Sequence, residues 1–433
     1  MMAALVVDSD SHIYEPPILW DRFVAPEYRA AARSALFHEV ADTGERITVL
    51  NGRPARDLNR SRLVRQAIWR PGMTPEDVGG LDPDVFFPLT PGASDPDSRR
   101  ADMDEVGIDQ AIVYPTIFTE YLPLVENPDV AAALARAYND WIWDFCSGGG
   151  ARLVPVAVLP LQSVLFSQRE LDRVAEKGFG AVLIRPAFYD TVRMAEHGAA
   201  AALRNIARHA GAGTIPGTVD SGGATEKVFV EDIPFRPIWK QIEQLDLVAC
   251  VHPSPGVAGP ENVSQGGFTE RVAEKLGIGH SVAEPVAAMQ DNGLFLTAAF
   301  FHGLLEDHPG LRMALAHSGA SWLPLATEKS ETYLWLSFAS VLEPVSLEPE
   351  DVVARHPLVV SFDSWERTVA RMPDIFETIA TWGSRYPNHD AAGPAEATAM
   401  LEEHGVPQAI VDRLMGANAA DLFRIVDTKT ASG

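Results

Sequence analysis

The sequence predicts an α/β protein whose strands and helices close into a (β/α)8 TIM barrel. Two observations support this prediction. Short apolar runs recur eight times along the chain, as expected of buried parallel strands. The stretches between them carry helical spacing of apolar residues and helix-ending glycines. A chain of 433 residues can hold one such barrel with insertions, although a doubly wound open sheet would show the same alternation.

The predicted elements follow one another along the whole chain. The eight strands are expected at residues 5–7, 111–114, 153–161, 181–184, 247–251, 313–316, 358–362 and 379–382. One helix begins after Asn127, which can cap it, and stops at the glycines of 148–150. Two more cover 171–177 and 235–245. We expect one domain over 1–433, with insertions at about 33–100 and 212–285 that lie over the C-terminal face of the barrel.

The composition excludes several classes of protein. Lys and Arg total 35 against 59 Asp and Glu, a net charge of −24, which argues against binding to nucleic acid or to an anionic membrane. No uncharged apolar run approaches the length of a transmembrane helix. Two cysteines, Cys146 and Cys250, exclude a disulfide framework. A cytoplasmic protein is expected.

Metal-binding side chains gather at the ends of the predicted strands. Because catalytic groups of a barrel sit at the C-terminal ends of its strands, residues at those positions are expected to meet. Mixed imidazole and carboxylate ligands suit zinc, manganese or iron. The candidate ligands are Asp10, His12, His252, His317, Asp363, Glu366 and His389.

Several motifs resemble the amidohydrolase-related superfamily, in the branch of the aminocarboxymuconate-semialdehyde decarboxylases. They are Asp8-Ser9-Asp10-Ser11-His12-Ile13-Tyr14-Glu15-Pro16-Pro17, Val251-His252-Pro253, Ala316-His317-Ser318-Gly319-Ala320-Ser321-Trp322, Trp382-Gly383-Ser384-Arg385-Tyr386-Pro387 and Arg136-Ala137-Tyr138-Asn139-Asp140-Trp141. The resemblance implies the same barrel. It implies that Asp10 and His12 are a first-strand metal pair, that His252 is the fifth-strand ligand, and that His317 orients water or substrate.

The eighth strand departs from the family pattern Gly-Ser-Asp-Tyr-Pro-His. Arg385 stands in place of the Asp, and Asn388 in place of the His. In the family that Asp binds the metal and moves a proton, and a guanidinium can do neither, because it stays protonated. Arg385 must therefore point away from the metal, pair with a carboxylate such as Asp390, or bind an anionic substrate. His317 and Arg385 are the candidate catalytic residues.

The surplus of candidate ligands leads to the main functional expectation. Six or seven protein ligands exceed what one zinc ion accepts and would suit two iron ions. At its altered eighth strand the chain resembles the nonheme diiron monooxygenases on this scaffold, which hydroxylate terpenoids held as coenzyme A thioesters. That resemblance implies a small-molecule acyl substrate and an external electron donor. Arg60, Arg62 and Arg65, in an arginine-rich stretch, would bind the phosphates of coenzyme A. Family members are often homodimers.

Two other functions stay open. One is a hydrolase or decarboxylase of the parent family that uses zinc or manganese and a displaced base. The other is a barrel that has lost catalysis and serves as a scaffold, for which the missing eighth-strand Asp is the support.

Overall fold

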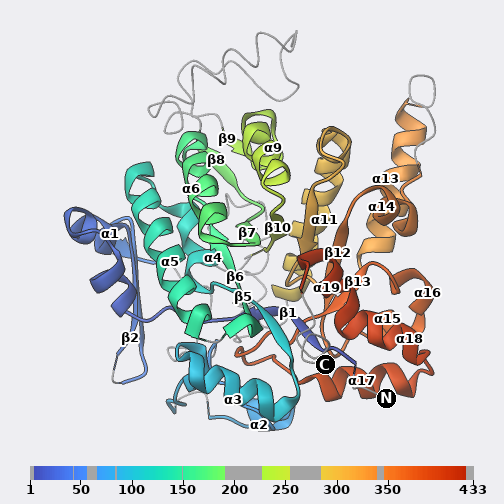
Figure 1. The fold of residues 1–433 in the computed structure, drawn as a ribbon, viewed down its shortest axis with the longest axis horizontal. Helices are drawn as coiled ribbons and strands as arrows, with labels where there is room; N and C mark the ends of the chain where they lie inside the picture. The colour runs from blue at the N-terminus through green and yellow to red at the C-terminus, as the bar shows by residue number, and fades with distance from the viewer. Residues whose placement is uncertain are drawn as a thin grey trace.

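A computed structural model of the protein describes residues 4–41, 43–55, 66–82, 85–148, 150–190, 227–253, 284–338 and 346–425. Its centre is a sheet of eight parallel strands that are neighbours in the order in which they occur along the chain (Figure 1). A doubly wound sheet would reverse that order at a switch point, so the barrel prediction is confirmed. The strands are β1 (Val7–His12), β5 (Gln110–Tyr114), β6 (Leu153–Val158), β7 (Ala181–Ile184), β10 (Val248–Val251), β11 (Arg312–Leu315), β12 (Leu358–Phe362) and β13 (Ala380–Trp382).

The barrel closes where the segment after β13 returns to β1. The backbone N–H of Arg385 donates to the carbonyl of Asp10 over 2.8 Å, and that of His12 donates to the carbonyl of Tyr386 over 2.6 Å. The approach needs a glycine, because a Cβ on Gly383 would lie 2.5 Å from the Cβ of Asp10. Closure therefore places the end of the last strand directly beside Asp10 and His12, the predicted first-strand metal pair.

Helices surround the strands, and the predicted ones are present. The helix after Asn127 is α5 (Pro128–Gly148), and the helix before Gly178 is α6 (Val164–Lys177). None of the helices in the described ranges is both long and apolar enough to cross a bilayer. The others outside the first insertion are α3 (Pro96–Val106), α4 (Ile117–Tyr121), α9 (Arg236–Gln244), α11 (Glu284–Phe301), α12 (Leu304–Asp307), α13 (Leu323–Phe338), α14 (Pro349–Arg355), α15 (Arg367–Arg371), α16 (Pro373–Phe376), α17 (Pro394–Glu403), α18 (Gln408–Asp412) and α19 (Asn418–Phe423).

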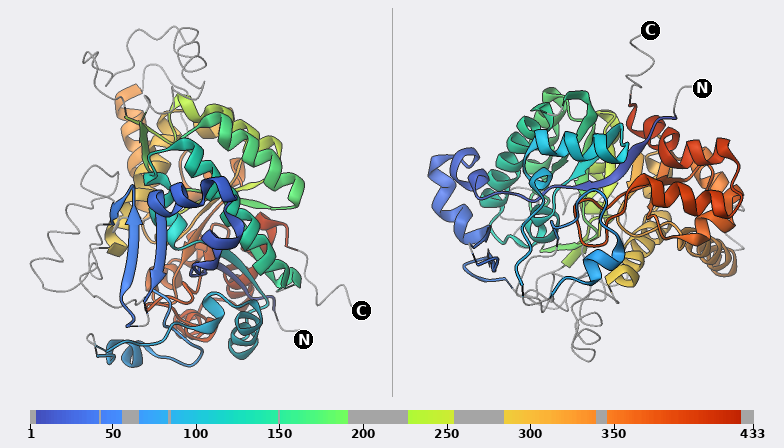
Figure 2. Two further views of the ribbon diagram at one scale, coloured as in Figure 1. Left: turned by 90° about the vertical axis from the view of Figure 1, so that its left-hand side faces the viewer. Right: turned by 90° about the horizontal axis from the view of Figure 1, so that it is seen from below.

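The first predicted insertion contains a small antiparallel sheet beside the barrel (Figure 2). Its described elements are α1 (Arg29–Ala35), β2 (Leu36–Val40), β3 (Arg46–Leu50), β4 (Arg53–Pro54) and α2 (Pro75–Gly79). Farther along, the N–H of Trp69 donates to the carbonyl of Pro387, so this part of the insertion lies against the loop after β13. Arg60, Arg62 and Arg65 lie outside the described residues.

The second predicted insertion is described only in part. Residues 212–226 and 254–283 lie outside the described ranges. Between them, β9 (Lys227–Phe229) pairs with β8 (Phe188–Asp190) as a short antiparallel ribbon that precedes α9 and β10.

Candidate metal centre

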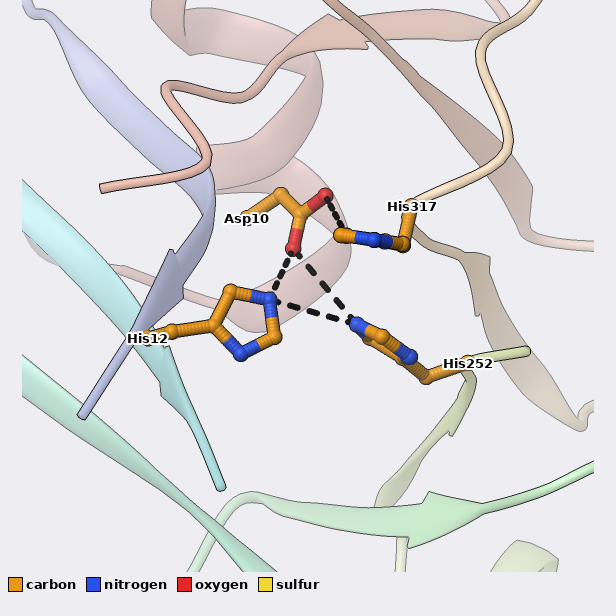
Figure 3. Close-up of side chains that lie close together, drawn as sticks. All are labelled: Asp10, His12, His252 and His317. Carbon is orange, nitrogen blue, oxygen red and sulfur yellow. Dashed lines mark hydrogen bonds and ion pairs between the residues drawn. The ribbon is translucent and has the colours of Figure 1, made fainter. Parts of the chain in front are cut away.

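Four predicted ligands meet at the C-terminal end of the barrel (Figure 3). Asp10 and His12 belong to β1, His252 follows β10, and His317 follows β11. One ligand atom from each lies within 4.8 Å of those from the others. Asp10, His12 and His252 are buried, and His317 is nearly so. The sequence predicted this meeting because parallel strands end at one rim.

The rings of His12 and His252 are oriented by backbone carbonyl groups. Nδ1 of His12 lies 3.1 Å from the carbonyl oxygen of Pro115, and Nδ1 of His252 lies 2.7 Å from that of Pro253. A carbonyl only accepts a hydrogen bond, so each Nδ1 carries a proton, and in the neutral ring that binds a metal each Nε2 presents a lone pair. The two Nε2 atoms are 3.2 Å apart. Two lone pairs therefore face each other in a buried place.

Asp10 adds a third electron-pair donor to the same point. Its Oδ1 lies 3.2 Å from Nε2 of His12 and 4.0 Å from Nε2 of His252. That oxygen accepts no hydrogen bond from any residue that the structure describes. Buried donors without partners are costly, and a cation bound between them would satisfy all three. The three residues thus fit a divalent ion, with the histidines held by carbonyls as metal-ligating histidines are.

The surroundings favour the protonation states that metal binding needs. Burial alone would raise the pKa of the Asp10 carboxyl, but the adjacent imidazoles of His12 and His317 bring its pKa well below the ordinary value. Burial, together with the other two imidazoles, lowers the pKa of His252 well below its usual range. The carboxylate is therefore charged and the His252 ring neutral near neutral pH.

His317 is held differently from the other two histidines. Its Nε2 lies 2.9 Å from Nη2 of Arg385, and a guanidinium only donates, so this nitrogen is an acceptor. The proton of the ring is then on Nδ1, which lies 3.5 Å from Oδ2 of Asp10. Burial and the positive charge of Arg385 lower the pKa of His317. The Nε2 lone pair that would bind a metal is directed at the guanidinium instead.

Arg385 pairs with a carboxylate, one of the three arrangements the sequence allowed. Its Nη1 lies 3.0 Å from Oδ2 of Asp390. Both Arg385 and His317 have φ of 61°, in the left-handed region that non-glycine residues seldom adopt. Hydrogen bonds hold each backbone there; the N–H of His317, for example, donates to Oγ of Ser361 over 3.0 Å. Such strain is typical of functional sites.

The remaining predicted ligands are not in the cluster. Glu366 accepts hydrogen bonds from the N–H of Ala320 and from the N–H and Oγ of Ser321, at 2.6–3.1 Å, so it holds the turn after His317. Asp363 accepts from the N–H of Trp365 over 2.9 Å. His389 lines the cavity in front of the cluster.

Two supporting residues were not predicted. The carboxylate of Glu15 accepts from three successive backbone N–H groups, those of residues 116–118, directly after the carbonyl that orients His12. The buried guanidinium of Arg99 donates to Oγ of Ser11 over 2.7 Å and to the carbonyl of His12. Glu15 lies in a motif already noted, whereas Arg99 lies on a distant helix and carries no sequence signal.

The cluster opens into a cavity of about 50 Å³. By the usual volume of a bound water, this enclosed part has room for a few water molecules or for the polar group of a larger ligand. The cavity wall is mostly polar and includes the three histidines of the cluster and Arg385. Among the lining residues are His12, Thr116, Glu120, His252, His317, Arg385, Asn388, His389 and Asp390.

Comparison with known proteins finds decarboxylases and amidohydrolases. A γ-resorcylate decarboxylase of Rhodococcus jostii is 28% identical over 227 residues, which is 52% of this chain and 56% of that enzyme, so the match spans only about half of either. An amidohydrolase structure from Mycobacterium avium subsp. paratuberculosis covers 98% of this chain and is fully covered itself, with a TM-score of 0.69 and 17% identity. A manganese-bound dihydroxybenzoic acid decarboxylase from Polaromonas, with an inhibitor, 2-nitroresorcinol, covers 99% of each chain, with a TM-score of 0.58 and 15% identity. At these identities the structures support the fold.

These relatives overturn the expected diiron monooxygenase. None of those reported above is an oxygenase or an enzyme of terpenoid biosynthesis, and they agree with the alternative of a metal-dependent decarboxylase or hydrolase. The expectation rested on a surplus of ligands around two iron ions. The described cluster contains four candidate residues, while the Glu366 carboxylate is bonded to a backbone turn. The oxidoreductase prediction is therefore wrong, and the relatives reported above give no support for iron, coenzyme A or an electron donor.

One comparison covers most of the chain. A family model described as Amidohydrolase matches residues 64–425. The match includes the strands that carry His252, His317 and Arg385, while Asp10 and His12 precede it on the strand that closes the barrel. The chain belongs to this amidohydrolase family.

Proposed function

We propose that the protein is a metal-dependent decarboxylase that acts on a small aromatic carboxylic acid. Asp10, His12 and His252 would hold one divalent ion, manganese or zinc. The observation that carries the proposal is the convergence of three unprotonated donors in a buried cavity. The substrate class is supported by the names of the relatives, which act on resorcylate and dihydroxybenzoic acid.

The chemistry divides between the ion and the side chains of the cavity. A bound divalent ion supplies a Lewis acid that draws electron density from an oxygen substituent of the ring. The carbonyls of Pro115 and Pro253 hold Nδ1 of the two histidine rings, so that their Nε2 atoms would be available to hold the ion. We propose His389, which lines the cavity outside the cluster, as the proton donor. The bond from ring to carboxyl carbon breaks, carbon dioxide leaves, and the proton takes its place on the ring carbon.

The arrangement favours decarboxylation over hydrolysis. Hydrolysis needs a base that removes a proton from water. The resemblance gives this proton transfer to the eighth-strand Asp in hydrolases and decarboxylases alike, so either reaction here needs another group for it. Here Arg385 occupies that position and stays protonated. The imidazole of His317 cannot serve as the base instead, because its Nε2 already accepts a hydrogen bond from Arg385. Decarboxylation needs an electron sink and an acid instead, and both are compatible with this cavity.

The test is carbon dioxide release by manganese-loaded protein. We would incubate it with 2,6-dihydroxybenzoate and with 5-carboxyvanillate, with and without dioxygen, and measure carbon dioxide and the ring product. Release in both atmospheres, lost in His252→Ala, is the expected result. Cleavage of aryl esters or amides without release of carbon dioxide from any aromatic acid would overturn the proposal.

A further inference from the structure

We propose that Arg385 is a specificity-determining residue that binds a second carboxylate of the substrate, one that is retained in the product, and that the carboxylate of Asp390 holds this place in the free protein. The inference rests on the proposed function and names its substrate more narrowly, as an aromatic dicarboxylic acid. It uses the residue at which this chain departs from the family pattern.

Hydrogen bonds at both ends of Arg385, from its backbone and from its guanidinium, fix the position of the side chain. The N–H of Arg385 donates to the carbonyl of Asp10, and its carbonyl accepts from the N–H of Asn388 over 3.0 Å. At the other end, Nη2 donates to His317. The side chain is 14% exposed and lines the same cavity as His12 and His252. A ligand on the metal therefore meets a pre-positioned guanidinium, which costs little entropy to engage.

Arg385 in place of the family's Asp makes the region beside the metal site two charges more positive, before the lining carboxylates of Glu120 and Asp390 are counted. Asp10 is the one carboxylate in the four-residue cluster, so a divalent ion there leaves a net charge of +1. The guanidinium raises this to +2, whereas an Asp at the same position would bring it to zero. A carboxylate lost as neutral carbon dioxide gains nothing from a guanidinium partner, because that contact stabilises the reactant more than the transition state. The guanidinium is therefore better matched to an anionic group that remains.

Asp390 shows what kind of group fits. Its Oδ2 lies 3.0 Å from Nη1 of Arg385, and its side chain is 33% exposed, more than twice the exposure of the arginine. A partly exposed carboxylate can leave such a pair at modest cost, because water solvates it when it swings away. A substrate carboxylate offers the same acceptor atoms to the same donor. Asp390 also lines the cavity, so exchange takes place where the substrate binds.

The test measures binding, so it does not depend on turnover. Manganese-loaded protein is titrated calorimetrically with benzoate, isophthalate and terephthalate, which compare one carboxylate with two at different separations. We expect the wild type to bind the better dicarboxylate about 10- to 100-fold more tightly than benzoate. Arg385→Gln should abolish this preference and Asp390→Asn should enlarge it. Arg371→Gln, which removes an exposed arginine on α15, is the matched control and should change nothing.

The outcomes separate this inference from the proposed function. Equal affinity for one and two carboxylates in the wild type, or a preference that survives Arg385→Gln with manganese retained, would overturn the role of Arg385. If Arg385→Gln loses its metal or fails to fold, Asp390→Asn decides, and unchanged dicarboxylate affinity there would count against the proposal. Absence of carbon dioxide release with the binding preference intact would contradict the decarboxylase alone.

Discussion

The two halves of the cavity use histidine in opposite ways. In the metal half (Asp10, His12 and His252), backbone carbonyls accept hydrogen bonds from the Nδ1–H groups of both histidines. Their Nε2 atoms face one another 3.2 Å apart. In the arginine half (His317, Arg385 and Asp390), a guanidinium donates to Nε2 and occupies its lone pair. The role of a histidine at the rim of this barrel thus depends on what its two nitrogens contact, not on its position alone.

The largest expected effect comes from removing a donor of the metal half. His252→Ala should lower manganese affinity by roughly 1000-fold, since structural sites gain several kcal/mol from each ligand. Metal analysis after dialysis, with chelator competition, measures this loss. His308→Ala is the control, because His308 pairs with Glu243 away from the cavity. Full manganese occupancy in a folded His252→Ala protein would contradict the assignment of Asp10, His12 and His252 as the metal ligands.

A second prediction separates metal ligands from residues that hold a loop. Glu366→Ala should lower the free energy of unfolding by about 2–3 kcal/mol, because it leaves donors of Ala320 and Ser321 without an acceptor. Glu366→Gln, which keeps one acceptor oxygen, should cost less. Urea denaturation measures both variants, and metal analysis should show manganese unchanged. Loss of manganese from folded Glu366→Ala protein would instead make Glu366 a ligand.

A third prediction concerns Arg385→Asp, a substitution that would give the arginine half a metal-binding side chain. Arg385→Asp removes the guanidinium, frees Nε2 of His317 and adds a carboxylate beside Asp10. Manganese affinity should rise by about tenfold, because a repelling cation is replaced by an oxygen donor. Competition with a fluorescent chelator measures the change. A fall in manganese affinity would mean that Arg385 organises the metal half and is not merely its neighbour.

The last expected effect is a pH dependence of stability. Burial raises the pKa of Glu15 from 4.5 to about 7, although three backbone N–H groups favour its charged form. The folded state therefore holds this proton more tightly than the unfolded state. The contribution to stability is complete below about pH 4.5 and is lost as the pH rises through 7. We expect about 2–3 kcal/mol less stability at pH 8 than at pH 5 from this group, measured by urea unfolding. Glu15→Gln should show a shallower slope, and an unchanged slope would contradict the assignment.

The sequence predicted the barrel and the meeting of four ligands because both follow from strand periodicity and from parallel strands ending at one rim. It could not predict which way a carboxylate beyond a strand turns. Glu366 was expected on a metal, but the turn after His317 presents amide donors to it, and a Cβ on Gly319 would lie 2.7 Å from its Oε1. Arg99 was not expected at all, since it reaches the carbonyl of His12 from 87 residues away.

A crystal structure of manganese-loaded protein with isophthalate, with anomalous scattering to place the metal, would show the metal half and the arginine half together. We expect one manganese ion between Oδ1 of Asp10 and Nε2 of His12 and His252, and a carboxylate of isophthalate on Arg385 in the place of Asp390. Two metal ions, a metal bound by Asp363 or Glu366, or an Arg385 still paired with Asp390 beside bound isophthalate would contradict this expectation.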